Sequence, residues 1–143
     1  MKKKSIILAS DHAGFELKEN IKKFLIKRKK KFFDLGTYSN KSVDYPDLAH
    51  RLSKKMKNGN KFFGILVCGS GIGMDMTANK HKNIRAALCY DLKSTKLSRK
   101  HNNANVMALG ARLTKKNLAL RCVEVFTRTN FDGGRHLRRV KKI

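Results

Sequence analysis

Residues 62–73 read Phe62-Phe63-Gly64-Ile65-Leu66-Val67-Cys68-Gly69-Ser70-Gly71-Ile72-Gly73. The first part of this stretch, up to Cys68, is apolar apart from one glycine and carries no charge. Such a run is typical of a strand that is buried on both faces of a parallel sheet. The three glycines that follow Cys68 allow a tight turn that leads directly into a helix. A buried strand followed at once by a glycine-rich turn and a helix indicates one βα unit of a parallel α/β fold.

The same alternation of strand and helix extends from this unit in both directions along the chain. We expect strands over residues 5–10, 31–35, 62–68, 84–89 and 106–109, and helices over residues 14–29, 46–59, 72–79, 91–100 and 114–126. Strands that alternate with helices at this spacing are joined by right-handed crossovers. The sequence therefore predicts an α/β fold, a Rossmann-like three-layer sandwich with a five-stranded parallel sheet, in one domain spanning residues 1–143.

The composition excludes several classes of protein. The 143 residues include 34 Lys and Arg against 10 Asp and Glu, and 41% of them are hydrophobic. That hydrophobic share is too high for a disordered chain, and the longest apolar run is too short to cross a membrane. The apolar run after Met1-Lys2-Lys3-Lys4 ends at Asp11, too early for a signal peptide. Three cysteines without a CxxC pair indicate free thiols in a reducing compartment, so we expect a cytoplasmic protein without a membrane partner or a metal site.

The net charge of +24 by itself suggests a nucleic-acid partner, because Lys and Arg release counterions from phosphate backbones. Lys outnumbers Arg by 24 to 10, however, and the lysines are spread over every segment expected at the surface. No basic motif with interleaved aromatic residues of the RNA-binding kind occurs. We therefore expect no nucleic acid as partner, and a basic nucleic-acid-binding protein is the less favoured alternative. A positive field of this kind also suits a small phosphorylated ligand.

Ligands of parallel α/β proteins bind beyond the carboxyl ends of the strands, so the residues at those ends are candidates for a functional site. They are Asp11, His12, Cys68, Cys89 and Arg112. The glycine-rich turn after Cys68 favours a thiolate base or nucleophile beside backbone N–H groups that can hold an oxyanion. The alternative for Cys68 is a small buried residue ahead of a tight turn. The loop after Cys89 is acidic and lacks glycine, which favours core packing for Cys89, as the helical pattern does for Cys122.

A dinucleotide site is a weaker interpretation of the same glycines. Their pattern is G-x-G-x-G, and Met74 stands where the last Gly or Ala of a dinucleotide-binding turn would be. The Gly-Lys-Ser/Thr ending of a nucleotide-triphosphate loop is also absent from this stretch. We therefore expect no nicotinamide cofactor.

Other polar residues have both a functional and a structural interpretation. Asp11 can cap a helix, with His12 in a solvated turn. His101-Asn102 lies where a helix ends, and it can serve a site beyond the strand ends only from a second subunit. Arg135 and Arg139 would share one face of a helix, which suits a phosphate monoester, or they belong to a frayed basic tail. Two histidines are expected at the surface without a role, His50 and His81.

Short motifs along nearly the whole chain resemble the type B ribose-5-phosphate isomerases and their galactose-6-phosphate isomerase relatives. They are Ala9-Ser10-Asp11-His12-Ala13-Gly14-Phe15-Glu16-Leu17-Lys18, Asp44-Tyr45-Pro46, Cys68-Gly69-Ser70-Gly71-Ile72-Gly73, Ala78-Asn79-Lys80, Ile84-Arg85-Ala86-Ala87-Leu88-Cys89, His101-Asn102-Asn103-Ala104-Asn105 and Gly133-Gly134-Arg135-His136. The resemblance implies an aldose–ketose isomerase that interconverts ribose 5-phosphate and ribulose 5-phosphate through an enediolate, without metal or cofactor. An isomerase of a 6-phosphohexose, galactose or allose 6-phosphate, is the alternative within the family.

The resemblance also implies a role for each candidate residue. Cys68 would move the proton between C2 and C1, and the donors around it would hold the developing oxyanion. Those donors are Gly69, Ser70, Gly71 and Gly73. His101, assisted by Asp11, would open the furanose ring. The residues that would hold the phosphate are His12, Arg112, Arg135 and Arg139, and those that would line the sugar site are Tyr45 and Asn102.

Members of this family are dimers or tetramers with active sites built from two subunits. The resemblance therefore implies a homo-oligomer in which the basic C-terminal segment, residues 131–143, reaches a partner subunit. One position departs from the family pattern, because Asp75 replaces the small neutral residue that is common there. A carboxylate so near the proposed thiolate would oppose its ionisation.

Overall fold

The structure, a computed structural model, describes residues 3–57 and 61–143. Its centre is a sheet of parallel strands in the order β2-β1-β3-β5-β4. The strands are β1 (Ser5–Ser10), β2 (Phe32–Asp34), β3 (Phe62–Cys68), β4 (Ala86–Leu88) and β5 (Val106–Gly110). This arrangement confirms the predicted five-stranded parallel sheet.

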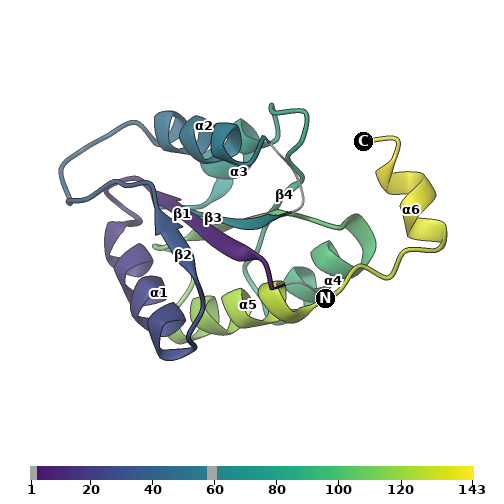
Figure 1. Cartoon of the computed structure of the whole chain (residues 1–143). Coiled ribbons are helices and arrows are strands. Elements are labelled where there is room, and N and C mark those ends of the chain that lie inside the picture. The colour runs from purple at the N-terminus through teal and green to yellow at the C-terminus, as the bar shows by residue number, and fades with distance from the viewer. Residues whose placement is uncertain (1–2, 58–60) are drawn as a thin grey trace.

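Helices cover both faces of the sheet and make the three layers of the sandwich (Figure 1). The helices are α1 (Phe15–Lys27), α2 (Tyr45–Lys55), α3 (Ile72–Ala78), α4 (Leu92–Asn102), α5 (Lys116–Arg128) and α6 (Arg135–Val140). Helices α2 and α3 lie on one face, and α1, α4 and α5 on the other, whereas α6 stands away from the sheet at the end of the chain. Within the described residues, no helix combines the length and the apolarity that a membrane span requires.

Each strand of the sheet centre contributes to two separate cores because successive side chains point to opposite faces. In β1, Ile6 and Leu8 pack with α1 and α5, whereas Ile7 and Ala9 pack with α2 and α3. All four side chains are at most 1% exposed. This burial on both faces explains why the central strands read as continuous apolar runs in the sequence.

The element boundaries differ from the sequence expectations mainly at the edges of the sheet. The strand expected over residues 84–89 is confined to β4, because this edge strand pairs only with β5 and only from Ala86 to Leu88. Strand β2, at the other edge, is shorter for the same reason. Helix α2 ends at Lys55, and the expected helix end at Asn58-Gly59 lies outside the described residues. Helix α5 begins at Lys116 and continues to Arg128, later at both ends than expected.

A buried ion pair that the sequence did not indicate fixes the start of α1 against β2. The side chain of Lys18 is fully buried, and its Nζ lies 2.7 Å from Oδ2 of Asp34. Lys22 contacts the same carboxylate at 2.8 Å, and the Gly36 N–H donates to its other oxygen. Although burial opposes it, the hydrogen bonds from the two lysines lower the pKa of Asp34. The network holds the chain that leaves β2 beside the carboxyl end of β1.

The two histidines expected at the surface are instead paired with one another. His50 on α2 and His81 after α3 are both half-buried, and Nδ1 of His50 lies 2.7 Å from Nε2 of His81. The packing of α2 on α3 brings together these two residues, which are far apart in sequence and stay partly exposed, and the sequence did not indicate that they pair. Burial, followed by the charge of His50, lowers the pKa of His81.

Candidate active site

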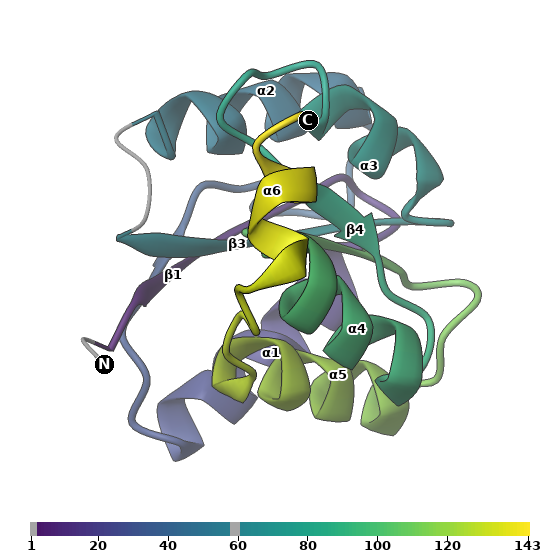
Figure 2. The same ribbon diagram turned by 90° about the vertical axis from the view of Figure 1, so that its right-hand side faces the viewer.

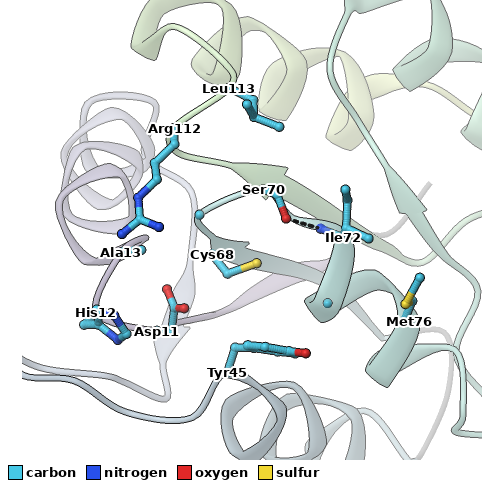
Figure 3. Close-up of a pocket in the computed structure, with 12 residues that line it drawn as sticks. Asp11, His12, Ala13, Tyr45, Cys68, Ser70, Ile72, Met76, Arg112 and Leu113 are labelled. Carbon is cyan, nitrogen blue, oxygen red and sulfur yellow. Dashed lines mark hydrogen bonds between the residues drawn. The ribbon is translucent and has the colours of Figure 1, made fainter.

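A cavity of about 560 Å³ lies beyond the carboxyl ends of β1 and β3. The two neighbours of β1 in the sheet are β2 and β3. From β1 the chain first adds β2 on one side and then returns to add β3 on the other side, so the strand order reverses between β1 and β3. Parallel α/β proteins bind their ligands at such a switch point. The cavity is lined by Asp11, His12, Ala13, Tyr45, Cys68, Gly69, Ser70, Ile72, Gly73, Met76, Arg112 and Leu113 (Figure 3). It therefore gathers most of the candidate residues that follow the strand ends.

Cys68 ends β3 at the floor of the cavity and is 4% exposed. The Gly71 N–H donates to its Sγ at an N···S distance of 3.1 Å. The sulfur is thus the acceptor of a backbone hydrogen bond from the glycine-rich loop that follows β3. Gly71 itself does not line the cavity but lies beneath the loop, with a φ of 80°. A Cβ on it would lie 2.7 Å from Leu88 Cδ1 and 2.9 Å from the carbonyl carbon of Leu109, so the loop geometry requires glycine.

Asp11 combines the structural and the functional interpretation offered by the sequence. Its Oδ1 accepts the Gly14 N–H at 3.0 Å, so it caps the turn that precedes α1. The carboxylate is 6% exposed and still lines the cavity beside Cys68 (Figure 3). Position 14 requires glycine because the turn packs closely against β3, where a Cβ on residue 14 would lie 2.4 Å from the Val67 carbonyl oxygen. A fixed carboxylate beside a thiol provides two groups that can exchange protons with one ligand.

His12 and Arg112 supply hydrogen-bond donors on one side of the cavity (Figure 3). The Val43 N–H donates to Nδ1 of His12 at 3.2 Å, which assigns the proton of the neutral ring to Nε2. The Arg112 N–H donates to the Gly69 carbonyl oxygen at 2.9 Å and anchors the start of that side chain. A Cβ on Gly69 would lie 3.0 Å from a guanidinium nitrogen of Arg112, so the guanidinium lies directly over the loop. Donors of this kind suit an anion the size of a phosphate group.

Tyr45 and three apolar side chains form the rest of the wall. Tyr45 is the first residue of α2, and its ring lies against Gly73, where a Cβ would be 2.4 Å from the ring. The exposed side chains of Ile72, Met76 and Leu113 stand at the rim. The sequence analysis did not predict these three residues. It examined the segments that follow β3 and β5 for polar groups only, and these side chains are apolar. Together they give one half of the cavity an apolar border.

Besides Gly71, four of the predicted site residues do not line this cavity: His101, Asn102, Arg135 and Arg139. His101 and Asn102 belong to the last turn of α4, and the chain from there enters β5 at its amino end. That junction is bonded to the start of β3, where the Gly64 N–H donates to the Asn105 carbonyl oxygen. The four residues therefore lie at the opposite edge of the sheet from Cys68, and within one chain the two groups do not meet.

The other two cysteines are core residues, as expected from the sequence. Cys89 is 1% exposed, and Cys122 is fully buried. Burial first, with the charges of Cys122 and Asp75 adding to it, raises the pKa of Cys89 to about 12, so its thiol stays protonated. Burial likewise raises the pKa of Cys122. Neither thiol is available as a base at neutral pH.

Asp75 lies on α3 and does not line the cavity. Burial raises its pKa to about 6. Its Oδ1 is one of two buried side-chain oxygens in the described residues without a hydrogen-bond partner. The position that departs from the family pattern is therefore occupied by a partly buried carboxyl group that lacks a hydrogen-bond partner on one oxygen and does not line the cavity.

The fold and the cavity define a Rossmann-like α/β protein with a thiol, a carboxylate and hydrogen-bond donors gathered in a cavity at its switch point. The model of the ribose/galactose isomerase family matches residues 6–143, and the chain belongs to this family. The family match covers the whole sheet apart from Ser5, the first residue of β1, and every residue that lines the cavity.

Individual relatives agree with this assignment over nearly their whole length. The ribose-5-phosphate isomerase B of Escherichia coli is 39% identical over 140 residues, 98% of this chain and 94% of that protein. A crystal structure of a ribose 5-phosphate isomerase from Thermotoga maritima is 48% identical, with a TM-score of 0.93 over 96% of this chain and 95% of that one. The isomerase B of Mycoplasma genitalium with bound ribulose-5-phosphate is 42% identical, with a TM-score of 0.92 over 96% of this chain and 92% of that one.

Proposed function

We propose that this protein is a ribose-5-phosphate isomerase that interconverts ribose 5-phosphate and ribulose 5-phosphate. The observation that carries the proposal is the cavity in which the Cys68 thiol, an acceptor of the Gly71 N–H, lies beside Asp11 and shares the lining with the donors His12 and Arg112 (Figure 3). The ribulose-5-phosphate bound to the Mycoplasma genitalium relative supports a pentose as substrate. The alternative with a 6-phosphohexose has no comparable support.

Cys68 acts as the base in the isomerisation. Its thiolate takes the proton from C2 of the open-chain aldose, and the electron pair moves into a C1–C2 enediolate with negative charge on O1. The resulting thiol returns the proton to C1, while the proton of the O2 hydroxyl passes to O1, so that O1 becomes the C1 hydroxyl and O2 becomes the ketone oxygen. Ser70 Oγ already accepts the Ile72 N–H at 3.2 Å, so its own proton is available to the enediolate oxygen. Preorganised donors of this kind stabilise charge that appears only on the way to the product.

The phosphate group lies at the side of the cavity formed by His12 and Arg112. The guanidinium of Arg112 offers several N–H donors in a plane, and His12 offers its Nε2 proton. Tyr45 borders the sugar from the opposite wall. This orientation places C1 and C2 of the sugar over Cys68, because the phosphate is held at the far end of the molecule.

A second copy of the chain completes the site and makes the protein a homodimer or a multiple of one. A cyclic sugar phosphate needs a general acid–base group for ring opening, and His101 lies across the sheet from its own Cys68. The exposed rim of Ile72, Met76 and Leu113 offers an apolar surface to a partner. The basic segment 131–143 then reaches the partner's cavity, where Arg135 and Arg139 add phosphate contacts and Asn102 contacts the sugar.

The three cysteines of the chain are free and buried, which suits a cytoplasmic enzyme in a reducing compartment. We further infer that residues 1–143 act as one domain, because both cores are built around a single sheet.

The test is turnover of ribose 5-phosphate by the purified protein in EDTA, beside allose 6-phosphate and galactose 6-phosphate at equal concentrations. We expect kcat/KM for the pentose to exceed that for either hexose by at least about tenfold, because one misplaced carbon is worth roughly 1–3 kcal/mol in a fitted pocket. The Cys68→Ala protein, purified in parallel, measures any isomerase carried over from the host. Faster turnover of a hexose, or equal activity of the two preparations, would overturn the proposal.

A further inference from the structure

Two imidazoles and a carboxylate meet at the junction of α4 with the C-terminal segment. The residues are His101 in the last turn of α4, Asp132 after α5 and His136 on α6, and their ligand atoms all lie within 4.8 Å of one another. The rings of His101 and His136 are stacked, with centroids 4.2 Å apart and planes inclined by 11°. We call these three residues the His–Asp–His cluster. Figure 2 shows α6 next to the end of α4, where the cluster lies.

The cluster is held together by the backbone rather than by chance contacts of long side chains. The Asp132 N–H donates to the Lys100 carbonyl oxygen at 3.0 Å, and Lys100 Nζ lies 3.4 Å from Asp132 Oδ2. Gly133 and Gly134, both at positive φ, then turn the chain so that α6 starts beside α4. Residues from two distant segments are thus fixed at one place, while the half-exposed side chains remain free to rotate.

Two histidines and one aspartate are a ligand set that Zn²⁺ prefers in proteins. With Zn–N bonds of about 2.0–2.1 Å, neighbouring ligands of a tetrahedral site are roughly 3.3 Å apart. The ligand atoms of the cluster lie up to 4.8 Å apart, so the widest of these separations has to shorten by about 1.5 Å when a metal ion binds. Rotation of the two imidazole rings is enough for a change of this size. A fourth position stays open for water or a phosphate oxygen. We propose that the His–Asp–His cluster binds a divalent transition-metal ion such as Zn²⁺, and that the bound ion inhibits the isomerase.

The inhibition follows from the proposed function, on which this part of the inference rests. If His101 opens the sugar ring in the partner's cavity, a metal ion on its ring nitrogen removes the lone pair that accepts the proton. The same ion ties α6 to α4 through His136 and so fixes the segment that carries Arg135 and Arg139. Zinc would therefore act on ring opening and on phosphate binding together, and chelation would reverse both effects.

The surrounding charge limits the affinity. Lys100 already pairs with Asp132, and three arginines of α6 flank His136. Cations near a site oppose the entry of another cation. We therefore expect dissociation constants in the micromolar range rather than those of structural zinc sites.

The His50–His81 pair provides a matched control. Its ring nitrogens are 2.7 Å apart, yet it belongs to no group of three ligand residues within the described part of the chain. His81→Gln removes one imidazole at a site that lacks a carboxylate. If two neighbouring imidazoles were enough for binding, this variant would lose affinity as well.

The binding test uses full-length, tag-free protein and measures competition for Zn²⁺ with a chromophoric chelator. We expect one ion per chain, at least tenfold weaker binding for Asp132→Asn and for His136→Gln, and unchanged binding for His81→Gln. Co²⁺ then reports the ligand type, because thiolate ligands add a sulfur-to-cobalt charge-transfer band that nitrogen and oxygen ligands lack. Unchanged affinity in both cluster variants, or a thiolate band that disappears in Cys68→Ala, would overturn the proposal.

The activity test separates the inhibition from the proposed function. We expect added Zn²⁺ to inhibit wild-type turnover of ribose 5-phosphate, EDTA to restore it, and Asp132→Asn to require at least tenfold more Zn²⁺ for the same inhibition. Metal binding at the cluster without inhibition would contradict the regulatory part of the inference. An inactive wild-type protein that binds Zn²⁺ through the cluster would refute the proposed function and leave the metal site standing.

Discussion

Cys68 differs from Cys89 and Cys122 in what surrounds its sulfur. All three thiols are buried, but Cys68 lines the active-site cavity, as the other two do not, and its sulfur accepts a backbone N–H from a glycine-rich loop. Cys89 and Cys122 lie in the core between the sheet and α5, where burial raises the pKa of each. The same residue type can serve as a reactive group or as a small apolar side chain according to its neighbours, and the surroundings of Cys68 fit the first, proposed role.

Asp75 makes stability depend on pH. Burial raises its pKa from 3.8 to about 6, so between these values the folded protein binds more protons than the unfolded chain. The free energy of unfolding therefore falls as pH rises through this interval. Above pH 6 the whole destabilisation that comes from the buried charge of Asp75 remains. A two-unit shift corresponds to roughly 3 kcal/mol, which solvent screening of this half-exposed carboxyl reduces to about 1 kcal/mol.

Asp75→Asn removes this penalty. We expect the variant to be more stable than the wild type by about 1 kcal/mol at pH 7.5 and nearly equal to it at pH 4, as measured by urea unfolding. A stability difference of the same size at both pH values would show that the effect comes from shape rather than from charge.

At the residue scale, sequence reasoning located the groups that follow strand ends and failed for groups paired across the fold. Asp11, His12, Cys68 and Arg112 were predicted because the carboxyl ends of parallel strands meet at one edge of the sheet. The partners Lys18–Asp34 and His50–His81 were not, because nothing in their spacing indicates that the helices bring them together. The resemblance to a family, rather than the residues alone, supplied the substrate and the individual roles.

The turn between β3 and α3 is the element on which the cavity depends most. Gly71 has a φ of 80° and no room for a Cβ, and its N–H is the donor to the Cys68 sulfur. Any other residue here strains the backbone and pushes against the backbone of β5. The sequence motif Gly-Ser-Gly-Ile-Gly is thus explained by one left-handed position and by two close approaches, of Arg112 to Gly69 and of Tyr45 to Gly73.

Gly71→Ala tests this account, with Gly133→Ala as its control. Gly133 also has a positive φ, of 67°, but a Cβ there would meet open space. We expect Gly133→Ala to cost about 1 kcal/mol of stability, and Gly71→Ala to cost about 2–4 kcal/mol and to lower kcat as well. Equal losses of stability in thermal or urea unfolding would mean that the contacts around Gly71 relax without strain.

At the element scale, the apolar runs and the helical periodicity predicted the order and type of every strand and of α1–α5. The boundaries were less predictable because they depend on pairing that the sequence does not show. Strand β4 ends where its single neighbour β5 stops pairing with it. In the C-terminal segment, residues 131–134 show no helical pattern. Only the spacing of Arg135 and Arg139 suggested the helix that the structure has as α6.

For the whole molecule, the separation of His101 from Cys68 across the sheet is the strongest argument for a shared site. A sequence shows which residues lie at which end of the strands, but whether a second copy of the chain brings the two ends together is a matter of assembly that it does not show. In one chain the cavity lies at one edge of the sheet and the basic segment at the other. If a twofold axis relates two copies, the basic segment of each copy can reach the cavity of the other.

Complementation between two inactive variants tests the shared site. Cys68→Ala and His101→Asn inactivate different halves of each site, so a mixed dimer keeps one site with both residues intact. Random assembly after coexpression should restore about a quarter of the wild-type activity per chain. The control pairs Cys68→Ala with Asp11→Asn, which lie in the same cavity and cannot complement. Recovery in the control alone, or in neither mixture, would show that His101 acts elsewhere.

The measurement that bears most directly on the proposed chemistry is the isomerisation of ribose 5-phosphate by Cys68→Ala and, as a matched substitution, by Cys89→Ala. Removing a general base costs about 10²–10⁴-fold in rate. We expect Cys68→Ala to lose kcat by that factor or more while binding ribose 5-phosphate nearly as tightly as the wild type, and Cys89→Ala to keep kcat within about threefold. Wild-type turnover by Cys68→Ala would contradict the assignment of Cys68 as the base that moves the proton between C2 and C1.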